Sequence, residues 1–372
     1  IKGMYPCLET DQNNPIDKSL IECFKWKDPK NTATLLATEI STLSGGVLNY
    51  IIKDENYYRL NDFPIKETGY QFDIQSYLNC YSGIGNCNID MADYTKMLGD
   101  PLIDGKSICQ IATEKNINEI WFFGGKNYGL FESKLISNSQ IYINSPSVDV
   151  TSCLMPTIVM GFELAPIYDN FNILDPTSSK YEEQKKDLLL ENPLHSYGHR
   201  IERIMKYIFQ NRKSYSFELN ADKSIKVISK NIKSNEFDLF YSYYYRQTYE
   251  ENGLKPPSFS NNDINNAHCG EIHFPPNTDT SYDYRNEINK VYSDCNLLYM
   301  YYPETTNPNL EIFQNQKDYI NCDPWGCTMY GYQKWWMKHI PNFEGGHENA
   351  FDLGPSLILN NWWRYISNPQ KL

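Results

Sequence analysis

The chain has 372 residues, 41% of them hydrophobic, so it is long enough to bury a sizeable core in one or two domains. Its net charge of −12 argues against a nucleic-acid partner, because an acidic surface gains nothing from releasing the counterions of a phosphate backbone. No run of 18 apolar residues occurs, so we expect no membrane span.

The cysteines point to an oxidising compartment. There are ten of them, an even number, and none forms a CxxC pair, which argues against a zinc ribbon and favours disulfides. The closely spaced pairs Cys80–Cys87 and Cys322–Cys327 are plausible local bridges. The first residue is Ile1, which fits either a mature protein after signal-peptide removal or a trimmed chain. We therefore expect a secreted, extracellular protein.

The first half of the chain is predicted to mix helices and strands. A short continuous apolar run closed by Gly124-Gly125 makes 117–123 the clearest strand, and a helix precedes it, as in an α/β layer. The other predicted elements are a helix or strand at 34–42, strands at 47–53, 140–144 and 157–164, and helices within 90–99, at 107–116, near 180–190 and at 192–209.

The composition changes after about residue 213. Residues 214–228 alternate like a hairpin, 237–249 could form an aromatic amphipathic helix, and 250–267 are rich in Pro and Asn. Four cysteines and five of the seven tryptophans come later still. We predict an α/β (α+β elaborated) protein with a mixed sheet and packed helices. Residues 1–213 would be the core domain, and 214–372 a disulfide-rich, loop-rich region packed on it.

The segment 192–209 is predicted to be a buried helix with a chemically active edge. Asn192 could cap it and Pro193 suits the first helical position. Residues spaced three and four apart form an apolar face: Leu194, Tyr197, Ile201, Ile204, Met205 and Ile208. A second stripe beside that face carries His195, His199, Glu202 and Lys206.

Two histidines four residues apart on one helix face can ligate one metal ion. The arrangement has a weak likeness to the HExxH helix of zinc metallopeptidases, but Ser196 stands where those enzymes keep the glutamate that activates water. Three interpretations stay open at this point. His195, His199 and Glu202 could hold a metal such as zinc, act as a metal-free acid/base pair, or form a satisfied polar edge.

The loop 267–277 (AHCGEIHFPPN) is a second candidate. His273 could supply a third imidazole to the helix pair, and three protein ligands plus water make an open catalytic zinc site. The alternative is a structural loop in which Cys269 is disulfide-bonded, and a bonded sulfur cannot be a ligand.

Two further stretches have competing interpretations. Glu132 lies in the segment 121–133, which follows a strand end, and it could be a carboxylate of the site or a structural residue. The late tryptophans, Trp335, Trp336, Trp362 and Trp363, could stack on sugar rings, although paired tryptophans are more often core. His339 and His347 are expected to be structural.

Several of these motifs together resemble an uncharacterised family of predicted secreted proteins from bacteria, fungi and amoebae. Its GHR-x-E, CG-x-x-H-[FY]-PPN and NWW-type motifs are similar to Gly198–Glu202, Cys269–Asn277 and Asn361–Trp363 here. A strand end, an ES pair and an NSP turn correspond to Trp121–Gly124, Glu132-Ser133 and Asn144–Pro146. The likeness covers much of the chain beyond about residue 90. The resemblance implies extracellular placement but supplies no activity to carry over, and it shifts emphasis from His195 towards His199, Arg200 and Glu202.

These observations favour a secreted hydrolase, with or without a metal, acting on extracellular peptide or polysaccharide. His195, His199 and His273 would be metal ligands, and His199 could instead be an acid/base group. Glu132 and Glu202 would orient a ligand or activate water, with Arg200 beside them. The alternative is a non-catalytic carbohydrate-binding or structural component of an extracellular layer, or a degenerate metallopeptidase.

Overall fold

The computed structural model describes most of the chain in segments. These are residues 20–24, 26–52, 57–60, 62–85, 87–138, 142–164, 177–179, 181–209, 216–219, 225–228, 237, 240, 269–278, 280–293, 295, 318–348 and 357–367. The chain divides into two compact units, Ile1–Glu39 with Asn49–Arg200, and Ile40–Leu48 with Ile201–Leu372. Helices accompany one mixed sheet and several antiparallel hairpins, which confirms the predicted fold class.

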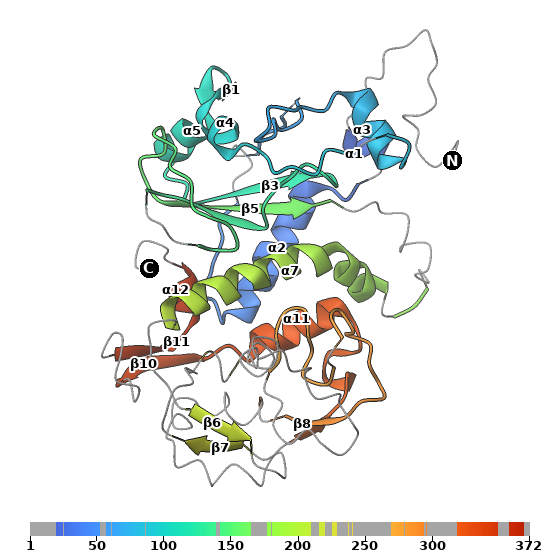
Figure 1. The fold of residues 1–372 in the computed structure, drawn as a ribbon, viewed down its shortest axis with the longest axis vertical. Helices are drawn as coiled ribbons and strands as arrows, with labels where there is room; N and C mark the ends of the chain where they lie inside the picture. The colour runs from blue at the N-terminus through green and yellow to red at the C-terminus, as the bar shows by residue number, and fades with distance from the viewer. Residues whose placement is uncertain are drawn as a thin grey trace. The chain divides into compact units, whose positions relative to one another are not determined.

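The first unit contains a three-stranded mixed sheet of order β3-β5-β4 (Figure 1). The central strand β5 (Thr157–Glu163) is parallel to β3 (Glu119–Gly124) and antiparallel to β4 (Ser133–Ile136). Its first six residues are buried, as a strand with neighbours on both sides requires. Gly161 is needed at its centre, because a Cβ there would lie 2.4 Å from the Phe131 carbonyl oxygen. The predicted strands at 117–123 and 157–164 are therefore confirmed.

The helices before β3 begin where the sequence provides capping side chains. The Asp93 carboxylate accepts from the Lys96 amide at the start of α4 (Tyr94–Gly99). Ser107 and Gln110 form a capping box at the start of α5 (Ile108–Glu114). The others are α1 (Leu20–Cys23), α2 (Pro29–Leu43) and α3 (Ile74–Tyr81), and the hairpin β1 (Pro101–Ile103)–β2 (Lys106–Ser107) joins α4 to α5.

Two hydrophobic clusters stabilise this unit. In one, Leu98 and Met97 of α4 pack with Val159 and Ile136 of the sheet. The other is aromatic and includes Tyr77 of α3, whose side chain is fully buried. The disulfides Cys80–Cys87 and Cys109–Cys153 cross-link the same segments, which confirms the first predicted local bridge.

The helix predicted at 192–209 is the second half of a longer helix, α7 (Tyr181–Phe209). The prediction that Asn192 caps a new helix was wrong, because the charged helix near 180–190 continues through Pro193 without a break. Contacts of its first half secure it in the first unit. Lys186 pairs with Glu39 of α2, and Lys27 donates to the Leu188 carbonyl. None of the described helices is long and apolar enough to cross a membrane.

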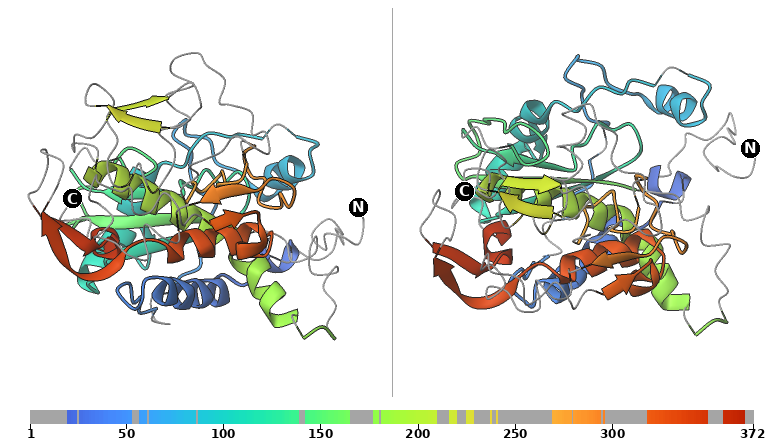
Figure 2. Two further views of the ribbon diagram at one scale, coloured as in Figure 1. Left: turned by 90° about the horizontal axis from the view of Figure 1, so that it is seen from below. Right: turned by 60° about the horizontal axis from the view of Figure 1, so that its bottom comes forward.

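The second unit contains short antiparallel pairs and two late helices. The hairpin predicted within 214–228 is confirmed as β6 (Ser216–Leu219) and β7 (Ile225–Ile228), the yellow arrows of Figure 2. A longer hairpin, β10 (Asn342–Glu348) with β11 (Leu357–Asn361), leads into α12 (Trp363–Ser367). The remaining elements are the pair β8 (Val291–Ser293)–β9 (Asp318–Ile320), the 3-10 turn η5 (Asp323–Trp325) and α11 (Met329–Lys338).

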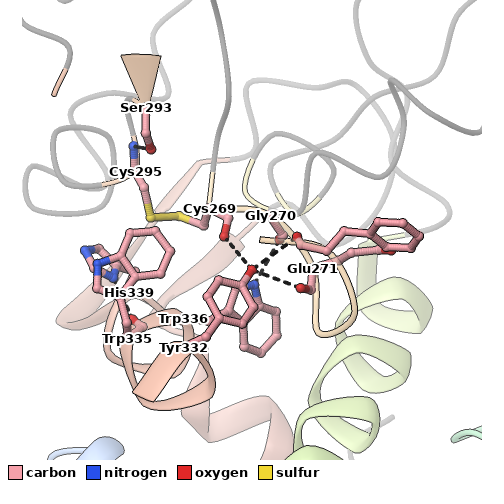
Figure 3. Close-up of a disulfide and its surroundings, with 10 residues drawn as sticks. Cys269, Gly270, Glu271, Ser293, Cys295, Tyr332, Trp335, Trp336 and His339 are labelled. Atoms are coloured by element: carbon pink, nitrogen blue, oxygen red, sulfur yellow. Dashed lines mark hydrogen bonds between the residues drawn. A yellow bond between two sulfur atoms is a disulfide. The ribbon is translucent and has the colours of Figure 1, made fainter. Parts of the chain in front are cut away.

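Helix α11 holds the loop that carries His273 (Figure 3). The Tyr332 hydroxyl lies 2.9 Å from the Glu271 carbonyl oxygen and 3.0 Å from that of Cys269, and Trp336 Nε1 donates to the Gly270 carbonyl at 3.0 Å. Gly270 has a φ of 76° and leaves no room for a Cβ, which would lie 2.6 Å from the Tyr332 hydroxyl. The loop is therefore fixed by side chains of the helix.

Disulfides and tryptophans complete this unit. Cys269 pairs with Cys295, and Cys322 with Cys327, which confirms the second predicted bridge and removes Cys269 as a ligand. The late tryptophans are core residues: Trp336, Trp362 and Trp363 are fully buried, and Trp335 is 8% exposed.

Three other predicted elements differ from the structure or lie beyond it. Residues 47–52 of the strand predicted at 47–53 form no strand and Ile51 is 78% exposed, since no strand among the described residues pairs with this segment. Of the predicted edge strand 140–144, the described residues 142–144 form a turn. The predicted helix 237–249 lies outside the described residues except at Phe237 and Phe240, which are helical.

Candidate metal centre

His195 and His199 lie one turn apart on α7, and their side chains meet. Their Nε2 atoms are 3.1 Å apart, and the rings are nearly perpendicular with centroids separated by 4.6 Å. Each residue is 8% exposed, so the pair is buried except for a small accessible area. The i, i+4 spacing therefore brings the two imidazoles together as the sequence predicted.

Glu132 is the carboxylate that faces this pair. Its Oε1 is 3.9 Å from His195 Nε2, and its Oε2 is 3.8 Å from His199 Nε2. Ser196 Oγ is 3.5 Å from Oε1, at the outer limit of a hydrogen bond. The Glu132 side chain is 34% exposed, so water can reach the point on which these groups converge. Ser196 thus lies beside a carboxylate that comes from another element.

The backbone around Glu132 is fixed by the sheet. Its carbonyl oxygen accepts from the Gly161 amide of β5 at 3.3 Å, and the next residue, Ser133, begins β4. Its side chain accepts a 2.6 Å hydrogen bond from Asn144 Nδ2 on Oε2. Glu132 is therefore held through both its main chain and its side chain.

His273 is the third histidine that the sequence nominates. His195 and His199 belong to the first unit and His273 to the second, and each of the three offers a ring nitrogen of the kind that ligates a metal ion. Within its own loop, the His273 ring packs against that of Tyr282 with centroids 4.6 Å apart, and the His273 carbonyl accepts from the Tyr282 amide at 2.7 Å. A second group with metal-ligating residue types, Glu287 with Cys322 and Cys327, has both sulfurs in one disulfide.

Arg200 belongs to a buried polar network on α7. Its Nη1 donates to Glu119 Oε1 of β3 at 2.7 Å and to the Tyr50 hydroxyl at 3.2 Å. The Tyr50 and Tyr197 hydroxyls are 2.7 Å apart, and Trp121 Nε1 donates to Glu119 Oε1 at 2.6 Å. Burial opposes the charge on Arg200, but Glu119 and the two tyrosines outweigh burial and raise the pKa of the guanidinium. The network therefore fixes a permanent cation between α7 and β3.

Glu202 and the residue that it contacts both lie in the second unit. Its Oε1 accepts a 3.0 Å hydrogen bond from the Ile272 amide, and the residue is 3% exposed. This contact fixes the backbone of Ile272, which directly precedes His273 in the chain. The remaining histidines predicted to be structural are His347, whose side chain lies outside the described residues, and His339, whose Nδ1 is 2.7 Å from the Trp335 carbonyl oxygen.

Sequence reasoning missed the residues that support the site. Asn144, Glu119 and Tyr50 were not candidates, although each bonds directly to a candidate. Asn144 carried one usable signal, because an asparagine before Ser-Pro favours a turn and tolerates a left-handed backbone. Comparison of the chain with protein-family models, curated proteins and solved structures finds no match.

Proposed function

We propose that the protein is a secreted, metal-dependent hydrolase acting on extracellular peptide or polysaccharide. The observation that carries the proposal is the convergence of His195 Nε2 and His199 Nε2, 3.1 Å apart, with the water-accessible carboxylate of Glu132. His273 is the proposed third imidazole. The disulfides fit an oxidising compartment, and the net charge of −12 argues against a nucleic acid, so the proposed substrate is a peptide or polysaccharide.

The separations distinguish ligands from a neighbouring base. Two ligands of one tetrahedral zinc ion, each bonded at about 2.0–2.1 Å, lie roughly 3.3–3.5 Å apart. The two Nε2 atoms are close to that separation, whereas both Glu132 oxygens lie farther from them, at 3.8 and 3.9 Å. Glu132 therefore suits a carboxylate hydrogen-bonded to a metal-bound water better than it suits a ligand.

This assignment gives each group a chemical role. Imidazole nitrogens are the protein ligands that zinc commonly takes in catalytic sites, and a fourth position left to water lowers the pKa of that water to about 7. With the metal bound, Glu132 would accept a proton from the water that attacks the substrate carbonyl or acetal carbon. It would return this proton to the leaving amine or alcohol as the bond from that carbon to the leaving group breaks. In HExxH helices the base follows the first histidine, where this chain has Ser196. Here the carboxylate comes instead from the residue that precedes β4.

The test measures metal binding and hydrolysis separately on the full chain. Zinc titration by calorimetry should give one ion per chain in the wild type, and His195→Ala or His199→Ala should weaken binding at least tenfold. Glu132→Gln should keep zinc affinity within about threefold and lower the rate of hydrolysis by about 10²–10⁴-fold in a panel of peptides, polysaccharides and activated esters.

His339→Ala is the matched control, because it removes a histidine bonded to the α11 backbone instead. It should bind zinc like the wild type. If the wild type binds no zinc, the 3.1 Å contact is a ring-to-ring N–H···N hydrogen bond of a structural pair, and the proposal fails. If zinc binds and no substrate class is hydrolysed, the hydrolase assignment fails while the metal site stands.

A further inference from the structure

We infer that Asn144 is a positioning residue for Glu132, presented by a turn that is preorganised for this purpose. The inference rests on the proposed function, because it concerns the carboxylate assigned to accept the proton. It adds a residue that does not touch the metal or the substrate and acts through Glu132.

The contact between the two side chains is short and has a defined direction. Asn144 Nδ2 lies 2.6 Å from Glu132 Oε2. A carboxylate only accepts hydrogen bonds, so the amide nitrogen must be the group that faces it. A charge-assisted bond of this kind is roughly twice as strong as a neutral one. With Oε2 held, Oε1 is left facing His195 Nε2 at 3.9 Å and Ser196 Oγ at 3.5 Å.

The backbone of Asn144 is held in an uncommon conformation. Its φ is 73°, in the left-handed region that asparagine tolerates and that is costly for most other residues. The Ile143 amide donates to the Ser145 carbonyl across it, at 3.3 Å. Such conformations persist where the surroundings impose them, and they gather at functional sites.

Hydrogen bonds to Ser133, the residue that follows Glu132, impose this backbone conformation on Asn144. Ser133 Oγ donates to the Ile143 carbonyl at 2.5 Å, and Ser145 Oγ donates to the Ser133 carbonyl at 2.9 Å. Ser133, Ile143 and Ser145 are all fully buried. The same pair of bonds therefore fixes the backbone segments that carry the amide donor and its carboxylate acceptor, and the residues that make these bonds are closed to water.

Holding the carboxylate in place before the reaction is the benefit that we expect from the Asn144 contact. A carboxylate on the three side-chain torsions of a glutamate samples many positions, and holding it in the productive one removes that entropic cost before the reaction. Changes to groups that orient a metal site typically lower activity or affinity by about 10–100-fold. Since Asn144 contacts Glu132, its loss should appear in turnover and leave zinc affinity unchanged.

The experiment uses zinc-loaded full-length protein and p-nitrophenyl acetate as the probe, since hydrolysis of this activated ester depends on activation of the attacking water. Asn144→Gly removes the amide and accepts the positive φ. Asn144→Asp keeps the shape and removes the donor. Both should lower kcat about tenfold or more, with KM within twofold and zinc affinity within threefold of the wild type. Adding Asn144→Gly to Glu132→Gln should cause no further loss, because both act through one carboxylate.

Ser107→Ala is the control for a general loss of stability. It removes the side-chain cap of α5 and leaves the hydrogen bonds around Asn144 and Glu132 intact, so it should lower the unfolding midpoint and keep kcat within twofold. The inference is overturned if Asn144→Gly keeps wild-type kcat, if Ser107→Ala lowers kcat as much, or if the losses from Asn144→Gly and Glu132→Gln multiply. A wild type that binds no zinc overturns the proposed function instead.

Discussion

At the scale of single residues, Arg200 and Glu119 form an ion pair that is almost fully buried. The guanidinium is 1% exposed and the carboxylate 11%, and Nη1 lies 2.7 Å from Oε1. The two charges stabilise each other because water has little access to either of them. Tyr50 and Trp121 donate further hydrogen bonds to Glu119. The pair joins α7 to β3 one residue after His199, so it fixes the helix that carries the candidate ligands.

Replacing Glu119 by alanine is expected to be strongly destabilising. A buried pair that loses one partner costs about 3–5 kcal/mol, because the remaining charge stays in a poorly solvating environment. Urea unfolding followed by circular dichroism measures the loss. The control is Glu114→Ala, which breaks the exposed ion pair with Lys106 and should cost less than about 1 kcal/mol. Equal losses in the two variants would contradict the role given to the buried pair.

His339 should make the protein less stable in acid. Burial lowers the pKa of its imidazole below 6.5, although the nearby Trp335 carbonyl raises it in part. The unfolded chain therefore takes up this proton at a higher pH than the folded chain. The contribution of His339 to stability is complete above pH 6.5 and is lost as pH falls below that value.

The measurement compares wild type with His339→Gln by urea unfolding at pH 7.5 and pH 5.5. Other groups titrate alike in both proteins, so the wild type should lose more free energy of unfolding on acidification than the variant does. A larger loss in the variant would show that protonated His339 is stabilised in the folded state.

At the scale of elements, Gly161 controls how the carboxylate is presented. A Cβ at this position would lie 2.4 Å from the Phe131 carbonyl oxygen and 2.7 Å from Leu130 Cβ, so β5 and the segment before Glu132 would have to separate. Gly161→Ala should cost about 1–3 kcal/mol, the usual range for overpacking. Gly99→Ala is the control, because its new methyl meets Val150 Cγ1 at 3.4 Å, an ordinary contact. Thermal unfolding that ranks Gly99→Ala as the less stable variant would refute this account.

Elements with local signals could be predicted from the sequence. Capping residues Asp93 and Ser107 begin helices where expected, and the apolar run before Gly124 is a strand. Pro193 led to a wrong prediction of a helix start at this position. A proline in the first turn and a proline inside a helix differ only in the residues that precede them. The segment 47–52 is β-rich but has no partner strand, and a single sequence does not reveal pairing.

The candidate site was predictable to a similar extent. The meeting of His195 and His199 follows from helical spacing alone. The approach of Glu132 depends on tertiary packing, so the sequence could nominate it only as a residue after a strand. Arg200 was nominated through a resemblance, and its ion pair with Glu119 was not foreseen, because nothing local relates the two positions.

At the scale of the whole molecule, each described disulfide stays within one compact unit. Cys80–Cys87 and Cys109–Cys153 lie in the first, and Cys269–Cys295 and Cys322–Cys327 in the second. The sequence predicted a division near 213. The compact units divide at Arg200, and residues 40–48 belong to the second unit. A single boundary along the chain cannot describe a unit that is made of two separate segments.

Loop length should set the stability that each disulfide contributes. Cys109 and Cys153 are separated by 44 positions, and Cys322 and Cys327 by 5. Loop-closure entropy predicts losses of about 4 and about 2 kcal/mol when each pair is replaced by serine. Differential scanning calorimetry of the two double variants tests the order. A greater loss from the Cys322–Cys327 pair would show that loop entropy does not govern these bridges.

The metal centre is tested most directly by anomalous diffraction at the zinc edge from crystals of the full chain grown with zinc. We expect one strong anomalous peak, which marks a zinc ion about 2.0–2.1 Å from His195 Nε2 and from His199 Nε2. His273 is expected to be the third ligand, and Glu132 to form a hydrogen bond with a water molecule on the ion. Histidine rings that stay in direct contact at 3.1 Å with no anomalous peak beside them would contradict this expectation.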